Sequence, residues 1–414
     1  MKLTQNKKKL INDPVYGFIT IPSDFIFDLI EHPWFQRLRR IRQLGLTDYV
    51  YPGANHSRYH HALGALHLMQ LAVAHLRGRG NAISEDEETG VYAAILLHDI
   101  GHGPFSHALE HAVIPDWPHE KLSLLIMQQL NSQFDGKLKL CIEIFQDSYP
   151  KKFLHQLVSS QLDMDRLDYL NRDSFFTGVV EGAVGSERII KMLDVVDDGI
   201  VVQEKGIYSI EKFLIARRLM YWQVYLHKTV LSAENLLVGT LLRARHLAER
   251  SRPVFASTSL HYFLSQANNI QDTSNSLDEI LRHFAALDDY DIFAAAKEWT
   301  NHDDAILRQL SLRLINRDLL RIHLDNEPFT DEQVQSYRSR LQAQGFATEA
   351  LPYFVFSGQI TNSAYKDGED KINVLLKDGR IAGLNRVADQ LHLSVLTHAT
   401  HKYFLCYPKE LELN

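Results

Sequence analysis

The sequence predicts a mainly α-helical fold with small β additions and an α+β segment at its C-terminal end. Apolar residues recur at helical spacing over most of the first 250 residues, and short β-prone runs occur near both ends. The composition, 45% hydrophobic and 23% charged, is that of a globular protein. Since domains usually hold about 100–200 residues, two or three units are expected. We predict a core over 1–250, a helical extension over 251–328 and a small α+β subdomain over 329–414.

The first 250 residues are predicted to be a hairpin followed by helices. Pro14 and Gly17 interrupt β-prone residues and predict a hairpin over 10–22. Ser23 is a typical N-cap, and the helical pattern that follows it continues past Pro33 to about Gly45. Further helices are predicted over 59–76, 85–98, 119–131, 151–173 and 209–250, with a small strand pair over 198–208.

The remaining residues change character twice. Residues 251–280 are rich in Ser, Asn, Thr and Gln, which predicts a boundary, and helical periodicity returns over 281–325. Thr330 and Gln333 have the spacing of a capping box and predict a helix. Strands are predicted over 353–356, 372–376 and 392–397, with a turn over 377–380.

Charge and cysteine content exclude several classes of protein. Lys and Arg number 44 and Asp and Glu 51, a net charge of −7, so non-specific binding to nucleic acid or an anionic membrane is not expected. Cys141 and Cys406 cannot form a disulfide framework, which favours a reducing compartment. The basic N-terminus lacks the apolar stretch of a signal peptide, and no apolar run reaches the length of a membrane span. We therefore expect a cytoplasmic protein.

Histidine, at 21 residues, is the most informative feature. Residues 98–107 hold three histidines and Asp99 beside a Gly/Pro turn, a density that core packing does not explain because buried polar groups must be paired. Adjacent residues at a helix end can embrace one ion, so His98 and Asp99 are candidate ligands. His61 and Asp165 on two other predicted helices complete the set. Two imidazoles and two carboxylates suit Mn, Fe, Zn, Ni or Mg. For an isolated His-Asp pair, a hydrogen-bonded surface or cap arrangement is the commoner explanation.

These residues resemble the signature of the HD-domain phosphohydrolases. The runs 11–17, 35–45, 51–64, 98–107, 163–173 and 225–228 are similar to the deoxynucleoside triphosphate (dNTP) triphosphohydrolase branch, which includes the bacterial dGTPases and the animal sterile-alpha-motif/HD proteins. The resemblance covers roughly residues 8–250 and implies an HD-domain catalytic core there. It implies metal-dependent cleavage at the α-phosphorus, which releases a deoxynucleoside and inorganic triphosphate.

The resemblance also implies roles for single residues. His61, His98, Asp99 and Asp165 would hold the divalent metal. The acid–base candidates are His102, His107, Glu110 and His119, with Glu110 standing where the family often has Asp. Arginines would bind phosphates, Tyr169 would pack on the deoxyribose, Asp173 would accept from the 3′-hydroxyl, and Gln43 with Leu44 would exclude ribonucleotides. The complete substrate-binding set is Gln43, Leu44, Arg58, Arg166, Tyr169, Asp173, Arg217, Tyr221 and Tyr225.

Regulation and assembly are implied by the same resemblance. Relatives form dimers and tetramers, some joined by activating nucleotides. The corresponding positions are Asn12, Glu31, Gln36 and Arg39, with Glu31 where guanine-reading relatives carry Asp. We expect a homo-oligomer with a nucleotide substrate and no membrane partner. Two alternatives stay open: an HD phosphohydrolase acting on another nucleotide (a monophosphate, a cyclic nucleotide or an alarmone), and a nucleotide-sensing or nucleic-acid-binding module without turnover.

Overall fold

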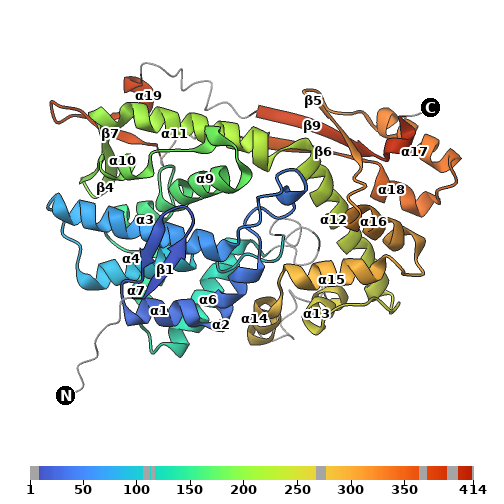
Figure 1. Cartoon of the computed structure of the whole chain (residues 1–414), viewed down its shortest axis with the longest axis horizontal. Coiled ribbons are helices and arrows are strands. Elements are labelled where there is room, and N and C mark those ends of the chain that lie inside the picture. Colours follow the sequence, from blue (N-terminus) through green and yellow to red (C-terminus); the bar gives the residue numbers. More distant parts are fainter. Residues whose placement is uncertain are drawn as a thin grey trace.

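The fold is mainly helical, as predicted. The computed structural model describes residues 9–105, 112, 117–266, 277–362, 371–388 and 400–412. His107, Glu110 and the predicted strand over 392–397 lie outside these residues. The chain opens with the predicted hairpin, in which β1 (Leu10–Asp13) pairs antiparallel with β2 (Gly17–Thr20). Figure 1 places this hairpin over the helices that follow it in sequence.

The helices of the first 150 residues lie close to their predicted ranges. Ser23 caps the first one, with its hydroxyl accepting from the Ile26 amide at 3.2 Å. The segment beyond Pro33 is less regular than predicted, since short turns replace one continuing helix. The bounds are α1 (Asp24–Glu31), α2 (Pro33–Gln36), the 3₁₀ turns η1 (Arg37–Arg40) and η2 (Thr47–Tyr49), α3 (Arg58–Gly78), α4 (Glu85–Leu97), α6 (His119–Gln133) and α7 (Lys139–Phe145).

The single helix predicted over 151–173 is wrong. The structure has α8 (Lys152–Val158) and α9 (Met164–Thr177). Buried Asp163 ends the connection between them, because its carboxylate accepts from the Ser160 amide at 2.8 Å and the Arg166 amide at 2.7 Å. Such local bonds compete with a continuous helix and instead cap a new one. Asp165 therefore lies in the first turn of α9.

The predictions over 198–208 and 209–250 need similar corrections. The strand pair lies earlier, as β3 (Leu193–Val196) and β4 (Gly199–Gln203). The long helix is divided into α11 (Ile207–Met220), a π-helical turn η5 (Tyr221–Tyr225) and α12 (Lys228–Glu249), with the His227 ring accepting from the Thr229 amide at 3.2 Å. π turns inside helices are frequent at functional sites. Between α9 and β3 lie η3 (Val180–Gly182) and α10 (Ser186–Ile190).

Three predictions beyond residue 250 are wrong in part. Residues 258–266 form a helix within the predicted boundary over 251–280, and residues 321–325 form a strand at the end of the segment predicted as helical. Residues 351–354 are helical, whereas a strand was predicted over 353–356. The helix beginning after Thr330 and the strand over 373–375 are confirmed. The elements are α13 (Thr258–Gln266), α14 (Leu277–Ala286), α15 (Asp289–Trp299), α16 (Ala305–Ile315), β5 (Arg321–Asp325), α17 (Asp331–Ala343), η6 (Thr348–Ala350), α18 (Leu351–Phe354), β6 (Phe356–Asn362), β7 (Asn373–Leu375), β8 (Ile381–Gly383), α19 (Leu384–Val387), β9 (Thr400–Tyr407) and η7 (Lys409–Leu411).

Strand pairing connects segments that are distant in sequence. β9 lies between β5 and β6, antiparallel to both, and β4 pairs in parallel with β7, which pairs with β8. The sheet of β5, β6 and β9 lies at the upper right of Figure 1, away from α4 and α7. The three predicted units are thus joined by strand pairs, and their independence as domains stays a prediction.

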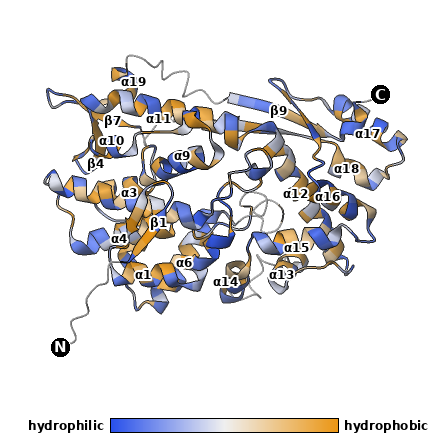
Figure 2. Cartoon of the chain, in the orientation of Figure 1, coloured by the Kyte–Doolittle hydropathy of each residue, from blue (hydrophilic) through white to orange (hydrophobic). Residues whose placement is uncertain are grey.

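The hydrophobic core surrounds α3, which carries His61, and α4, which is followed directly by His98 and Asp99. α3 packs against both α4 and α9, and residues 90–97 of α4 are all buried. Figure 2 shows mixed and hydrophobic colouring along α3 and α4, whereas α17 is largely hydrophilic and buries Val334 and Leu341. Among the described residues, no helix has the length and apolar character needed to cross a membrane.

The turn between α14 and α15 brings a buried carboxylate to the first half of the chain. Asp289 is 5% exposed and accepts from the backbone amides of Arg42 at 2.9 Å and Phe105 at 3.2 Å. Burial raises the pKa of Asp289 to about 6, although the two amides and the Arg42 guanidinium oppose the shift.

We expect this carboxyl group to make stability depend on pH. Between about pH 4 and pH 6 the folded state binds the Asp289 proton more tightly than the unfolded state, so this group's contribution falls as pH rises. The unfolding free energy of the wild type minus that of Asp289→Asn should therefore fall by up to about 3 kcal/mol as the pH rises from about 4 to about 6. Urea unfolding of both proteins at several pH values measures it, and a constant difference would contradict the assignment.

Candidate active site

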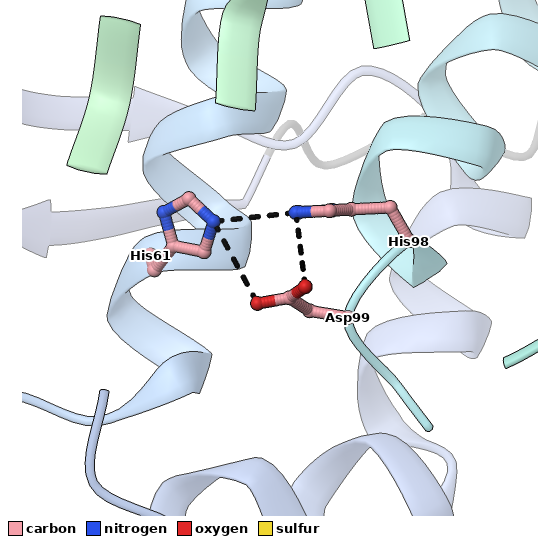
Figure 3. Close-up of side chains that lie close together, drawn as sticks. All are labelled: His61, His98 and Asp99. Carbon is pink, nitrogen blue, oxygen red and sulfur yellow. Dashed lines mark hydrogen bonds and ion pairs between the residues drawn. The ribbon is translucent and has the colours of Figure 1, made fainter. Parts of the chain in front are cut away.

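Three helices bring the four predicted metal ligands together. His61 lies on α3, His98 and Asp99 directly follow α4, and Asp165 lies in the first turn of α9. The Nε2 atoms of His61 and His98 are 3.3 Å apart, and Asp165 Oδ1 lies 3.1 Å from the first and 3.5 Å from the second. Figure 3 shows the two imidazoles and the Asp99 carboxylate pointing toward one another. His61, His98 and Asp99 each offer one possible metal-ligating atom, and these three atoms lie within 4.8 Å of one another.

The other ring nitrogen of each histidine is already occupied. His61 Nδ1 lies 2.8 Å from Asp168 Oδ2, and His98 Nδ1 lies 2.7 Å from the Ile95 carbonyl oxygen. Carboxylate and carbonyl oxygens only accept, so both Nδ1 atoms donate. In neutral rings both Nε2 atoms are then unprotonated, and two such atoms at 3.3 Å cannot bond to each other. This is the arrangement of ligating histidines, and the residues therefore fit a divalent cation.

The electrostatics of the cluster also favour a cation. Burial lowers the pKa of His61, but the carboxylates of Asp165 and Asp168 outweigh it and raise that pKa to about 10. Burial acts to raise the pKa of Asp99, yet His98, His102 and Arg58 hold it well below its usual range. A site that binds a proton this strongly provides the negative potential that a metal ion requires, and metal binding releases that proton.

A buried ion-pair network supports the His61 ring. Arg172 donates from Nε to Asp168 Oδ2 at 2.9 Å and from Nη1 to Asp13 Oδ2 at 2.8 Å. Gly64, three residues after His61, allows the network to approach α3, because a Cβ there would lie 2.0 Å from Asp168 Oδ1. No role for Asp168, Arg172 or Asp13 was predicted from the sequence. Two signals were available: the spacing of Asp165, Asp168 and Arg172 along one helix, and the position of all three supporting residues within the family-like runs 11–17 and 163–173.

Two of the predicted acid–base residues lie beside the cluster. His102 Nε2 is 3.2 Å from Asp99 Oδ1, and the His102 ring stacks on His119 with centroids 3.8 Å apart. Burial lowers the pKa of His102 to about 3, and the nearby Arg58 charge acts in the same direction. His102 is therefore neutral at pH 7. His119 Nε2 lies 3.4 Å from Glu120 Oε1.

A cavity of about 590 Å³ opens beside the metal ligands. Asp99 and Asp165 are part of its lining, as are Tyr169 and Asp173, which lie on the same face of α9 as Asp165. It contains most of the predicted substrate-binding residues: Gln43, Leu44, Arg58, Arg166, Tyr169, Asp173, Tyr221 and Tyr225. Arg217 is not in the lining; its guanidinium lies 6.0 Å from the Tyr221 ring centroid. His102 and His119 also line the cavity.

The two arginines in the lining are held by carboxylates. Arg58 Nη1 donates to Asp99 Oδ2 at 2.5 Å, and Arg166 pairs with Asp163. These ion pairs fix both guanidinium groups next to the metal ligands.

Asp173 is oriented by two donors. His56 Nε2 lies 2.7 Å from Asp173 Oδ1, and the Tyr225 hydroxyl donates to Oδ2 at 2.8 Å. Burial raises the pKa of Tyr225 well above its usual range, so the hydroxyl remains protonated. The His56 ring stacks on Phe176 with centroids 4.5 Å apart. No role for His56 was predicted from the sequence, because its position in the chain gives no indication of a contact with Asp173.

The four predicted regulatory residues lie outside the cavity lining. Asn12 is in β1, Glu31 ends α1, Gln36 ends α2 and Arg39 is in η1. The Gln36 amide donates to the Ile30 carbonyl at 2.7 Å, and Arg39 Nε donates to Gln36 Oε1 at 2.7 Å. The Arg39 guanidinium lies 3.6 Å from the Tyr59 ring centroid. Gln36 and Arg39 are thus brought together.

Comparisons with known proteins agree with this geometry. The HD domain matches residues 58–172, and the HD associated region matches 184–252. A solved structure of a phosphohydrolase from Bacteroides thetaiotaomicron is 49% identical, with a TM-score of 0.92, and the match covers 96% of this chain and 99% of that one. The uncharacterized protein YwfO of Bacillus subtilis is 32% identical, with 98% of this chain and 93% of YwfO covered.

The deoxynucleoside triphosphate triphosphohydrolase SAMHD1 homolog of Dictyostelium discoideum is 31% identical over 58% of this chain and 50% of its own length. The match to this relative therefore spans about half of it. The regions matched by the two family models contain the four predicted metal ligands and the residues of η5 and α12 that line the cavity. Of the α9 residues in the lining, Asp165, Arg166 and Tyr169 lie in the HD-domain match and Asp173 lies one residue beyond it. From the convergent donor set and these matches, the chain belongs to the HD-domain family of metal-dependent phosphohydrolases.

Proposed function

We propose that this protein hydrolyses dNTPs to deoxynucleosides and inorganic triphosphate. The observation that carries the proposal is one continuous cavity. Its lining includes Asp99 and Asp165 of the predicted metal site together with Tyr169, Asp173 and the Gln43–Leu44 pair. The similarity to a named dNTP triphosphohydrolase supports the substrate class.

The metal would be held by His61, His98, Asp99 and Asp165. The chemistry that a divalent ion supplies when bound there is polarisation of a phosphoryl oxygen and activation of water. Arg58 and Arg166 would bind phosphate oxygens, for which guanidinium groups have the matching geometry. Water attacks the α-phosphorus, the bond to the 5′-oxygen breaks, and that oxygen takes up a proton. His119, on the cavity wall, is a candidate donor, as is His107.

Asp173 would accept a hydrogen bond from the 3′-hydroxyl of the sugar, while Tyr169 packs on the ring and Gln43 with Leu44 excludes a 2′-hydroxyl. Asp173→Ala should then lower kcat/KM for dNTPs by about 10- to 100-fold, the range for a hydrogen bond to a charged group. The kcat/KM for dideoxynucleotides, which lack the 3′-hydroxyl, should change little in this variant. Steady-state kinetics with both substrates and Mn²⁺ titration measure this. An equal loss of metal affinity would remove Asp173 from the sugar-binding role.

The reaction itself is tested by product analysis. Purified protein is incubated with Mn²⁺ or Mg²⁺ and each dNTP, singly and mixed, and products are separated into triphosphate, pyrophosphate and phosphate. Release of triphosphate with a deoxynucleoside supports the proposal, and pyrophosphate or stepwise phosphate release contradicts it. Ribonucleotides serve as matched substrates that the Gln43–Leu44 wall should reject.

A second candidate, hydrolysis of a nucleoside monophosphate, is favoured by one observation. Among the described residues of the cavity lining, the arginines Arg58 and Arg166 are the cations, and both already pair with carboxylates. A monophosphate needs fewer cationic partners than a triphosphate. Rapid phosphate release from monophosphates, with dNTPs unchanged, would favour this candidate.

Activation and assembly are part of the same proposal. We infer a cytoplasmic homo-oligomer, a dimer or tetramer, with an activating nucleotide near Asn12, Glu31, Gln36 and Arg39. Activity that appears only in nucleotide mixtures, and that Arg39→Ala removes, would support this site. Light scattering with and without the mixture measures assembly.

A further inference from the structure

One buried carboxylate bridges two walls of the cavity. Asp289 Oδ2 accepts from the Arg42 amide at 2.9 Å, and Oδ1 accepts from the Phe105 amide at 3.2 Å. Arg42 immediately precedes Gln43 and Leu44, which line the cavity, and Phe105 itself lines it from the segment that follows the metal ligands. Asp289 thus contacts the backbone at both walls without lining the cavity itself.

Phe105 has a backbone that bulky residues rarely adopt. Its φ is 50°, in the left-handed region, where a side chain with a Cβ is strained. Such residues persist where surrounding structure holds them, and they gather at functional sites. The Phe105 ring packs edge-on against Phe293, with centroids 5.3 Å apart and an interplanar angle of 71°. Asp289 and Phe293 are four residues apart on α15 and so lie on one helix face.

Further contacts join the same segments. Arg37 is fully buried and donates to the Ile100 carbonyl at 2.8 Å and to the Leu287 carbonyl at 3.2 Å. Arg40 pairs with Asp288. The turn into α15 is therefore attached both to the segment preceding Gln43 and to the segment following Asp99. Residues 287–293 lie outside the two regions matched by the family models.

We propose that Asp289 and Phe293 are positioning residues of the active site: they hold Phe105 in its left-handed conformation and set its separation from the Gln43–Leu44 wall. A displacement of about 1 Å at a reacting substrate can lower the rate by about 10²-fold. Asp289 and Phe293, called the clamp below, therefore affect turnover although α15 contributes no side chain to the cavity lining. The kinetic part rests on the proposed dNTP substrate, and the structural part does not.

Amide hydrogen exchange tests the structural part without any substrate. Asp289→Ala and Phe293→Ala should increase exchange in a peptide ending at Phe105, and Asp289→Ala also in a peptide containing Arg42. Tyr290→Ala is the matched control, because Tyr290 is 68% exposed on the same helix. Asp289→Asn retains one acceptor oxygen and should show an intermediate effect; this variant and Phe293→Ala carry the test if Asp289→Ala does not fold. If the folded Asp289 and Phe293 variants exchange the Phe105 amide at the wild-type rate, the proposal is overturned.

Kinetics test whether the clamp acts through Phe105. With bound Mn²⁺ matched, Asp289→Ala should lower kcat for dNTPs by about 10- to 100-fold with KM changed less than about threefold. In a Phe105→Gly background, where the left-handed conformation is unstrained, the loss should be at least about three times smaller. Equal losses in both backgrounds would overturn it. If the wild type turns over no dNTP, the proposed function fails, and the exchange result still decides on the clamp.

Discussion

Asp165→Ala is expected to remove metal binding and to lower phosphohydrolase activity by at least about 10³-fold, since a metal ion contributes several kcal/mol to such reactions. Asp165 Oδ1 lies close to the Nε2 atoms of both His61 and His98, at 3.1 Å and 3.5 Å, whereas the nearest Asp99 oxygen to His61 Nε2 is 3.9 Å away. The loss of Asp165 leaves Asp99 as the only carboxylate among the predicted ligands. His98→Ala should have the same effect, because it removes one of the two imidazoles. Isothermal titration with Mn²⁺ and a phosphate-release assay measure the two losses.

Neither substitution should unfold the protein. Asp165 lies two residues after the N-cap Asp163, and the repulsion between these two carboxylates is relieved when Asp165 is removed. Matched controls are Asp86→Asn in the first turn of α4 and His261→Ala, both at exposed positions. These should keep full activity and metal affinity. Retained hydrolysis in Asp165→Ala or His98→Ala at matched bound metal would refute the site.

The convergence of the four predicted metal ligands could be predicted because the residue types that point to a metal occur in short, recognisable stretches of sequence. His98 and Asp99 are adjacent, the segment after them is broken by Gly and Pro, and His61 and Asp165 lie in motifs that resemble one family. The structure places one ligand atom each of His61, His98 and Asp99 within 4.8 Å of one another, and it places Asp165 Oδ1 within 3.5 Å of both imidazoles. Helix starts were predictable for the same reason, since a capping side chain such as Ser23 or Thr330 bonds within its own turn.

Elements defined by remote partners could not be predicted in this way. β5 follows a helical pattern in sequence, and its strand conformation depends on pairing with β9, whose partner residues lie about eighty positions later. The breaks at Asp163 and His227 come from single side chains that cap a new helix where periodicity alone predicts a continuous one.

The supporting residues of the site were missed for a related reason. Asp168 and Arg172 have the i, i+4 spacing of an exposed salt bridge, and only the structure shows that both are fully buried beneath His61. His56 is one histidine among many in its segment, and its bond to Asp173 spans 117 residues. Asp289 lies in a region without any recognised motif. Asp168, Arg172 and His56 lie within runs that resemble the family, but the resemblance does not show which buried partner each of them contacts.

Asp168→Asn is expected to weaken metal binding by about 10- to 100-fold, the usual cost of changing a residue that orients a metal-binding histidine. The Asp168 carboxylate accepts a hydrogen bond from His61 Nδ1 at 2.8 Å, and its charge raises the pKa of that ring. An amide of the same shape provides no charge and fixes the ring less firmly. Turnover at saturating Mn²⁺ should recover most of the wild-type rate, because the four ligands remain.

The same substitution should destabilise the fold. Arg172 is fully buried, and after the change its charge is balanced by Asp13 alone. Removing one partner from a buried ion pair costs about 3–5 kcal/mol, so urea unfolding should show a loss of that order. Glu249→Gln, which breaks the surface pair with Arg245, is the matched control and should cost less than about 1 kcal/mol. Wild-type Mn²⁺ affinity in Asp168→Asn would mean that His61 is oriented by the packing of α3, and that the buried network beneath it serves stability alone.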